Sequence, residues 1–561
     1  MRSAKKEWRG EEYSICGPAI DADFRVMRKI ETVSRRIAPR QVSRTSNATQ
    51  SSIAAGEVDR KKSQSGQLKM LRVEATAILS DAMGAGENKL AIDREALNGA
   101  GQHETVNGLE RGLGLKEAVA LNMIEIVGIG PFVVSGIVIR EMGGPQALLA
   151  WLAGALLATL DAFVWSELGA AMPKAGGTYV FLREAYGPLR WGRLMSFLFV
   201  WQTFVQAPLS VASASIGFTR YAGYLHPLSP LEAKAVSGGL VIFLVILLYR
   251  RITTIGKISL LLWAGVIATL LWLIWGGARH FDSKIAFDFP PGAFRFSWVW
   301  FAGLGSAMVS TIYSYWGYYN ICHLGGEIRE PEKNIPRGIF LSVLGIAVLY
   351  LAMQTSILGV VPWREAQNSK FIVSTFVERL YGHGAASVAT AMVLWIALAS
   401  VFSVLLGYSR VPYSAALDGN FFSVFGRLHP TKHFPHISLL ALGALAFFFS
   451  VKLDLETSIA GILAVRLIVQ FIGQAVGVML LRRRFGTERL PFKMWLYPLP
   501  AVLTMIGWAW LFWHTGAARK WGLLEILLGV LAFLVWTKTM KQWPFEKNRT
   551  VRGSKSTLTT Q

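Results

Sequence analysis

The stretch Asn122-Met-Ile-Glu-Ile-Val-Gly-Ile-Gly-Pro-Phe132 lies inside an apolar segment, residues 117–140, and carries two glycines and a proline in mid-segment. Proline removes a backbone donor and clashes with the preceding helical turn, and glycine weakens a helix. Within a membrane, the freed backbone groups are tolerated where they line a polar cavity. We therefore predict a broken helix here, although a simple proline kink would also explain this segment taken alone.

Eleven further apolar segments follow this one along the chain. A helix that crosses a bilayer needs ~20 mainly apolar residues, because the hydrocarbon layer is ~30 Å thick and each residue rises ~1.5 Å. The 561 residues are 53% hydrophobic, and their mean hydropathy is +0.40. We predict an all-α integral membrane protein of about twelve transmembrane helices, in which the ninth is short. The further segments are 145–171, 193–224, 234–249, 256–276, 300–324, 336–360, 385–409, 437–451, 457–481, 498–515 and 522–537.

The sixth segment contains a second interruption. Its end, Ser314-Tyr-Trp-Gly-Tyr-Tyr-Asn-Ile-Cys-His-Leu-Gly-Gly-Glu327, is polar and aromatic for a span, and glycines again break the helical pattern. The first and sixth segments are the first members of two sets of five. Interrupted segments at corresponding positions in two halves of a chain indicate an inverted-repeat transporter. The pair favours broken helices far more strongly than either segment does alone.

The basic residues are distributed as in a membrane protein rather than a nucleic-acid-binding protein. The net charge is +22, but the loops between apolar segments hold much of the basic charge. Loops that follow even-numbered segments carry eighteen lysines and arginines, and those that follow odd-numbered segments carry twelve. Lysine and arginine are enriched on the cytoplasmic side. We predict a multi-pass protein of the cell membrane with both termini cytoplasmic, and no nucleic-acid partner.

The first 112 residues differ from the rest. They are polar and basic, and their apolar residues follow no sustained helical or strand period, so they cannot bury a core. We expect a disordered cytoplasmic tail. An over-long translation start, with Met70 or Met83 as a later start, is the alternative.

Three groups of residues resemble the amino acid–polyamine–organocation superfamily. Gly128-Ile-Gly-Pro-Phe132 is similar to the unwound glycine motif of its first helix. The loop after the second segment and the loop after the sixth are also similar to the superfamily's loops, in order and spacing. The similar residues are Trp165–Pro173 at the end of the second segment, Gly176–Tyr179 and Ala185–Pro188 after it, and Gly326–Pro331 with Asn334–Arg337 after the sixth segment. The resemblance covers residues 113–484 well and 485–540 loosely.

The resemblance implies a leucine-transporter-like fold with five-plus-five inverted repeats and two appended helices. The expected units are a first repeat at 113–276, a second repeat at 296–484, helices eleven and twelve at 498–540, and a cytoplasmic tail at 541–561. It also implies a secondary transporter that moves amino acids or related amines by alternating access. A polyamine transporter, or a nutrient sensor that binds without transporting, are the alternatives with the same fold.

The breaks predict a substrate site. The half-helix after Gly130 would present free N–H groups to a substrate carboxylate. Half-helices that end near Val127 and Tyr315 would present carbonyls to an ammonium group. The aromatic residues at the second break would cover the ligand or make cation–π contacts, or would simply pack. The candidate substrate-binding residues are Glu125, Val127, Gly128, Ile129, Gly130, Tyr315, Trp316, Gly317, Tyr318 and Tyr319.

Glu125 is the ionisable residue beside the first break, one turn before its glycines. A charge deep in a span is costly and usually faces a cavity. Glu125 is therefore interpreted as a counter-ion for an amine or as a proton carrier; the alternative is a glutamate that reaches water or a loop arginine. Polyamine-uptake branches of the superfamily carry a similar glutamate, together with an aspartate in helix six. Here aromatic residues replace that aspartate, which is closer to branches for neutral or cationic amino acids.

Coupling residues are also implied by the resemblance. Lys257 is similar to the helix-five lysine of sodium-independent members, whose ammonium stands where sodium would bridge helices one and eight; a lysine of the cytoplasmic boundary is the alternative. Ser400 and Ser403 would form the hydroxyl pair of a sodium site if Lys257 points elsewhere. Three arrangements suit Arg466: pairing with Glu125 or Asp161, lining an exit path, or reaching a membrane boundary.

Other classes of protein are disfavoured. The chain has no phosphate-binding loop, zinc spacing or nucleophile elbow, so we expect neither an enzyme nor a transport ATPase. It has two cysteines, Cys16 and Cys322, which argues against a disulfide framework or a thiolate metal site. We expect no cofactor. The expected partners are a small amino acid or amine, protons and the lipid bilayer.

Overall fold

The computed structural model describes residues 105–106, 109–454, 461–462, 465–488 and 490–545. The expected cytoplasmic tails therefore lie almost wholly outside the described residues, as does part of the tenth predicted segment. The described chain is helical except for two short antiparallel strands, β1 (Thr105–Val106) and β2 (Leu109–Glu110), and two isolated bridges. Both strands lie within the residues predicted to form the N-terminal tail. Leu109 of β2 is buried against Ala175 and Tyr413, so this part of the predicted tail packs against the helical region.

Helices occur at each of the twelve predicted segments. Seven of the described helices are long and apolar enough to cross a membrane, and the bent pair α3–α4 makes an eighth. The helices at the predicted segments are α3 (Leu115–Ile126) with α4 (Gly130–Met142), α5 (Ala147–Ala171), α7 (Trp191–Leu225), α8 (Pro230–Leu248), α9 (Ile252–Arg279), α11 (Trp298–Tyr315) with α12 (Asn320–His323), α13 (Pro331–Leu358), α16 (His383–Tyr408), α18 (His436–Lys452), the π-helix η3 (Leu467–Ile472) with α20 (Gly473–Phe485), α21 (Leu499–His514) and α22 (Ala518–Thr539).

Shorter helices connect these segments. They are α6 (Thr178–Tyr186), α10 (Ser283–Ala286), η1 (Gly325–Glu327), α14 (Trp363–Ala366), α15 (Ile372–Tyr381), α17 (Arg410–Leu417) and η2 (Ser423–Gly426). Local sequence signals set several starts. α8 begins with a capping box, in which Ser229 accepts from the Glu232 amide, and Pro230 occupies the first turn. Ser297 caps α11 by accepting from the Trp300 amide.

The outer helices carry apolar side chains on their exposed faces. On α8, Phe243 and Ile246 are exposed, and on α9 Leu261 and Trp275 are exposed. Apolar stripes of this size are rare on soluble proteins and are typical of helices that face lipid. This pattern agrees with the membrane-protein prediction.

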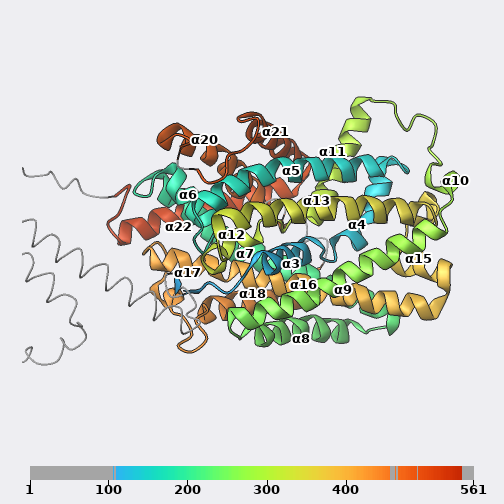
Figure 1. The fold of residues 1–561 in the computed structure, drawn as a ribbon, viewed down its shortest axis with the longest axis horizontal. Helices are drawn as coiled ribbons and strands as arrows, with labels where there is room; N and C mark the ends of the chain where they lie inside the picture. The colour runs from blue at the N-terminus through green and yellow to red at the C-terminus, as the bar shows by residue number, and fades with distance from the viewer. Residues whose placement is uncertain (1–104, 107–108, 455–460, 463–464, 489, 546–561) are drawn as a thin grey trace, which may run out of the picture. The chain divides into compact units, whose positions relative to one another are not determined.

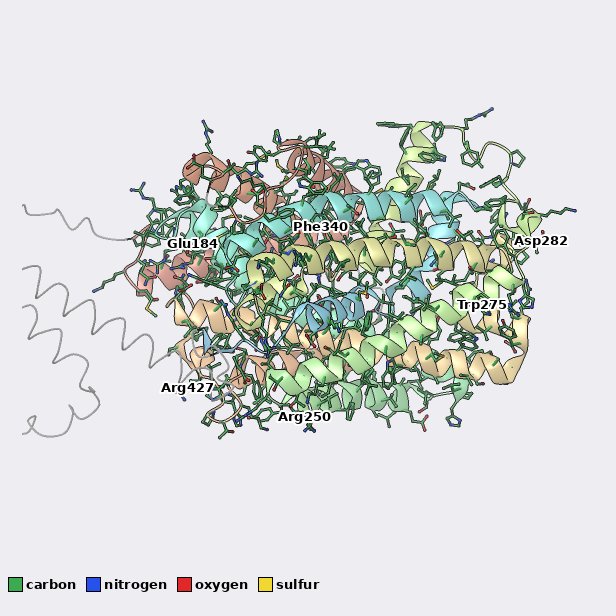
Figure 2. All side chains as sticks on the ribbon, in the orientation of Figure 1. Glu184, Arg250, Trp275, Asp282, Phe340 and Arg427 are labelled. Carbon is green, nitrogen blue, oxygen red and sulfur yellow. The ribbon has the colours of Figure 1, made fainter. Side chains whose placement is uncertain are left out.

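The broken helices lie inside the bundle. α3 packs against α9, α13 and α16, and α4 packs against α11. In Figure 1 the blue α3 and α4 lie between α13 on one side and α9 on the other. The labelled residues mark the two ends of the bundle: Glu184 of α6 and Arg427 lie at one end, and Trp275 of α9 and Asp282 lie toward the other (Figure 2). The core position of α3 and α4 places their break inside the bundle rather than on its exposed face.

Candidate functional site

The first predicted break occurs between α3 and α4. α3 ends at Ile126 and α4 begins at Gly130, and the two helices are bent by 45°. Pro131 stands in the first turn of α4, where its missing N–H removes no intrahelical hydrogen bond. The Phe132 amide already donates to the Ile129 carbonyl at 3.1 Å, whereas the Ile129 and Gly130 amides have no backbone acceptor among the described residues. These two amides are therefore available to an anionic group.

The second predicted break also occurs, and it lies against the first. α11 ends at Tyr315 and α12 begins at Asn320. Between them, Gly317 has φ of +122°, a conformation that side chains rarely allow. A Cβ atom there would be 2.7 Å from Glu125 Cγ and 2.7 Å from the Ile126 amide nitrogen. Only glycine therefore lets the second break pack directly on the end of α3.

Two buried side chains hold the breaks in place, and the sequence analysis assigned a role to neither. The Asn122 amide donates to the Tyr318 carbonyl at 2.5 Å and accepts from the Ile321 amide at 3.0 Å. The Tyr350 hydroxyl of α13 lies 2.9 Å from the Ile126 carbonyl and 3.2 Å from the Ser314 carbonyl. Some of the carbonyls expected to bind an ammonium group therefore already have protein partners.

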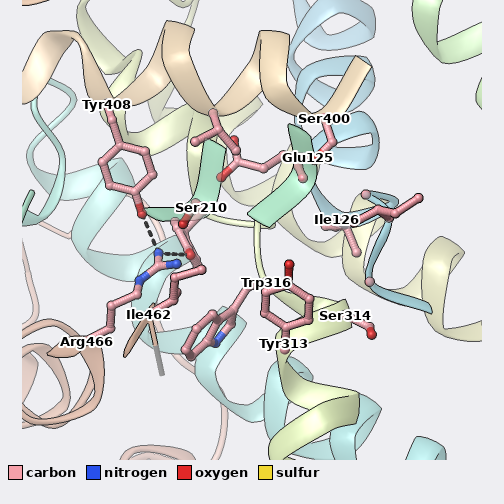
Figure 3. Close-up of a pocket in the computed structure, with 16 residues that line it drawn as sticks. Glu125, Ile126, Ser210, Tyr313, Ser314, Trp316, Ser400, Tyr408, Ile462 and Arg466 are labelled. Atoms are coloured by element: carbon pink, nitrogen blue, oxygen red, sulfur yellow. Dashed lines mark hydrogen bonds between the residues drawn. The ribbon is translucent and has the colours of Figure 1, made fainter. Parts of the chain in front are cut away.

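A cavity of about 50 Å³ lies between the two breaks (Figure 3). Seven of the predicted site residues line it: Glu125, Gly128, Ile129, Gly130, Trp316, Tyr319 and Ser400. Side chains from other helices complete its wall. They are Ile126, Ser210, Ala214, Tyr313, Ser314, Val404, Tyr408, Ile462 and Arg466.

Six predicted residues lie outside this lining, namely Lys257 and five residues at or near the breaks. Val127 and Gly317 belong to the breaks themselves. Tyr315 packs edge-on against the Trp151 ring and in a tilted contact with the Tyr350 ring. Tyr318 turns away and donates to Asp161 at 2.6 Å. Ser403 donates to the Leu121 carbonyl at 2.8 Å and accepts from Asn320 at 2.7 Å, so it diverges from Ser400 instead of pairing with it.

Lys257 does not occupy the expected position. Its side chain is exposed, and it lies on the same stripe of α9 as exposed Leu261 and Trp275. Successive residues on a helix are rotated by about 100°, so Gly256, not Lys257, faces Glu117 of α3. In this structure the ammonium therefore does not bridge α3 and α16, and the position matches the alternative of a boundary lysine.

Arg466 provides the fixed positive charge of the cavity instead. It is 3% exposed, and its guanidinium carbon is 4.5 Å from the centroid of the Trp316 ring. It donates to the hydroxyls of Tyr319 and Tyr408, and its Nε donates to Gln470 at 3.0 Å. The π-helix η3 begins directly after it, and such bulges are frequent at functional sites.

Asp161 has other partners, so it is not the counter-ion of Arg466. It accepts from Tyr318, from Trp165 at 2.7 Å and from Trp508 at 3.3 Å. Asp161 thereby connects Trp508 of α21 to Tyr318, the residue that follows Gly317. Asp161 thus positions the wall of the second break rather than lining the cavity.

Glu125 is the acidic residue of the cavity wall. It is 8% exposed, and its Oε2 atom is buried with no hydrogen-bond partner among the described residues. It interacts electrostatically with the Arg466 guanidinium. In Figure 3 the Glu125 and Arg466 side chains enter the same pocket from different helices. The cavity therefore contains one acidic and one basic side chain, and backbone groups from two broken helices.

The sequence model of the family described as amino acid permease matches residues 113–535. The chain belongs to this family, within the amino acid–polyamine–organocation superfamily. The resemblance read from the glycine motif and the two loops is thus confirmed, and the permease is a transporter rather than an enzyme.

Relatives of the permease are named for different amino acids. It is 24% identical to the serine/threonine exchanger of Bacillus subtilis over 72% of the chain and 91% of the relative. It is 26% identical to the branched-chain amino acid permease of Lactococcus lactis over 76% of the chain and 94% of the relative. It is 25% identical to human cationic amino acid transporter 4 over 67% of the chain and 60% of that relative. The names of these relatives include neutral and cationic amino acids. Family membership therefore does not identify the class of side chain on the substrate of this permease.

Proposed function

We propose that this permease is a secondary active transporter that moves amino acids across the cell membrane by alternating access, and that the cavity between the two breaks binds the substrate. The observation that carries the proposal is the meeting of two interrupted helices at one buried polar cavity. Twelve spans in a five-plus-five inverted repeat, with two appended helices and cytoplasmic termini, complete the proposed architecture.

The backbone at the breaks suits the part that all α-amino acids share. The α4 start at Ile129 and Gly130 offers N–H groups and the positive end of a helix dipole to the substrate carboxylate. The α3 end near Val127 offers carbonyls to the ammonium group, apart from the Ile126 carbonyl that Tyr350 occupies. Substrate side chains would then extend toward Trp316 and Arg466.

The size of the cavity supports a conformational cycle. Its volume of about 50 Å³ is far below the ~300–1,000 Å³ that is usual for pockets that hold small molecules, so the cavity is contracted in this conformation. Residues of the wall must therefore move before substrate enters. Opening alternately to the two sides is the motion by which such folds transport.

Sodium-independent coupling is part of the proposal. Ser403 is already engaged by Leu121 and Asn320, which leaves it poorly placed to ligate sodium beside Ser400. Glu125 supplies a buried carboxylate within the cavity wall, so it is the proposed proton carrier. Exchange of one amino acid for another is the alternative form of sodium-independent turnover.

Uptake into proteoliposomes tests the proposal. The purified full chain should accumulate at least one labelled amino acid without sodium, under an imposed proton gradient or against amino acid loaded inside. Binding without accumulation would identify a sensor instead. A strict sodium requirement would overturn the proposed coupling but not the transport function.

A further inference from the structure

The Arg466 side chain occupies the position that a cationic substrate side chain would need. Its guanidinium already lies over the Trp316 ring, at 4.5 Å from the centroid, and donates to two phenol hydroxyls. An aromatic face and hydroxyl acceptors are the groups that bind an organic cation. A lysine or arginine substrate would therefore find these groups in use and would meet a like charge.

The partners of Arg466 are neutral. Its hydrogen bonds go to Tyr319, Tyr408 and Gln470, and among the described residues no carboxylate lies within 4 Å of it. A neutral side chain of similar length would satisfy the packing without the cost of burying a charge. The charge itself is thus not required by these contacts, which suggests that it serves the cavity.

Glu125 balances Arg466 across the cavity. It is the acidic residue of the lining, and one of its oxygens has no hydrogen-bond partner in the described chain. Together the two side chains keep the charge of the wall near zero. A neutral substrate leaves this balance intact, an acidic side chain can bind the guanidinium, and a cationic one would compete with it.

We infer that Arg466 is a specificity-determining residue, which excludes amino acids with cationic side chains and admits those with neutral or acidic side chains. This inference rests on the proposed function, because it concerns the substrate of the same cavity. It predicts that the permease differs in specificity from its relative named for cationic amino acids.

Competition binding on the purified full chain tests the inference. Lysine, glutamine and glutamate would be compared on the native protein and on R466M, R466K and R466M/E125Q. On the native protein, lysine should bind at least about tenfold more weakly than glutamine. R466M should shift the lysine-to-glutamine ratio toward lysine by about tenfold or more, because the Trp316 face and the Glu125 carboxylate become available to the substrate cation.

Two variants separate charge from shape. R466K keeps a positive charge in the cavity, so it should still exclude lysine. R466M/E125Q removes the acidic partner as well, so the gain in lysine binding should largely disappear. A merely structural role for Arg466 would lower the affinity for all three amino acids together and leave their ratios unchanged.

E125Q alone tests the same inference if R466M does not fold. Without Glu125 the Arg466 charge is unbalanced, so the glutamate-to-glutamine affinity ratio should rise by about tenfold. Tight native lysine binding, or folded R466M with native affinity ratios, would overturn the inference, as would an unchanged ratio in E125Q. If no amino acid binds or accumulates on the native protein, the proposed function fails instead, so the two failures are distinguishable.

Discussion

Gly317 has a backbone conformation and a set of neighbours that only glycine satisfies. Gly317→Ala would place a Cβ atom 2.7 Å from Glu125 Cγ and from the Ile126 amide nitrogen, at φ of +122°. Strained backbone of this kind costs about 1–3 kcal/mol, and the clash adds to that cost. We expect a lower thermal unfolding midpoint in detergent together with weaker amino acid binding.

Gly384→Ala is the matched control for this substitution. Gly384 lies in the first turn of α16, and a Cβ atom added there would have no neighbour within 4 Å among the described residues. Alanine favours the helix, so this variant should be at least as stable as the native protein. Equal unfolding midpoints for the two variants would contradict the proposed contact between the breaks.

Tyr350 links both breaks through one hydroxyl. Tyr350→Phe would remove the donor to the Ser314 carbonyl and one of the two donors to the Ile126 carbonyl, which also accepts from the Gly128 amide at 2.9 Å. An unsatisfied buried group costs about 1–3 kcal/mol. We expect reduced thermal stability and lower amino acid affinity, measured on the purified protein. Tyr381→Phe is the control, because Tyr381 is exposed and its hydroxyl has no hydrogen bond among the described residues; a native-like Tyr350→Phe would show that the link is dispensable.

The residues that sequence analysis could identify are those whose effect is local. Gly128, Gly130 and Pro131 alter the backbone at their own positions, so their interruption of the helix was visible in the sequence. The Tyr350 bond to Ile126 spans 224 positions, and the signal for it is one tyrosine in an apolar segment. The contacts of Arg466 with Tyr319 and Tyr408 are equally non-local, which is why its role stayed open until the fold was known.

At the scale of helices, the lengths of the apolar runs predicted where the helices lie in the sequence, but not how each helix is rotated about its own axis. Each predicted segment contains a helix, because long apolar runs persist whatever the tertiary arrangement. The rotation of a helix about its axis depends on packing instead. For Lys257, a difference of one residue, or about 100°, separates the α3 side of α9 from the exposed stripe.

A buried ion pair joins two helices far apart in the sequence, α5 and α20. Arg482 donates to both oxygens of Glu167, at 2.6 Å and 2.5 Å, and the Glu167 side chain is fully buried. Glu167→Gln would leave Arg482 without its charged partner, and breaking a buried pair costs about 3–5 kcal/mol. We expect a large fall in the unfolding midpoint.

An exposed pair provides the comparison. Arg379 Nη2 lies 2.7 Å from Glu365 Oε2, and both side chains are more than 40% exposed. Exposed pairs contribute about 0–1 kcal/mol, so Glu365→Gln should have little effect on the unfolding midpoint. Similar midpoints for Glu167→Gln and Glu365→Gln would show that the pair between α5 and α20 does not stabilise the fold.

For the whole molecule, periodicity and composition predicted a helical membrane protein, and short motifs predicted its family. They did not predict β1 and β2, because strands of two residues have no periodic signal. The sequence also could not predict that the two breaks enclose one small cavity. That arrangement depends on Gly317 meeting α3 and on Asn122 binding the far side of the second break.

The proposed topology makes a prediction about the whole chain. Glu184 and Arg427, from loops with the larger basic charge, lie at one end of the bundle, and Asp282 lies at the other (Figure 2). Because lysine and arginine favour the cytoplasmic side, the end with Glu184 and Arg427 should face the cytoplasm. Reporter fusions to the full chain after Lys284 and after Arg484 should therefore report opposite sides, with the second cytoplasmic. A fusion after Arg427 is the internal control, since it should agree with the one after Arg484. Signals from the same side for Lys284 and Arg484 would refute the twelve-span arrangement, whereas opposite sides with Lys284 cytoplasmic would keep the alternation and reverse the orientation.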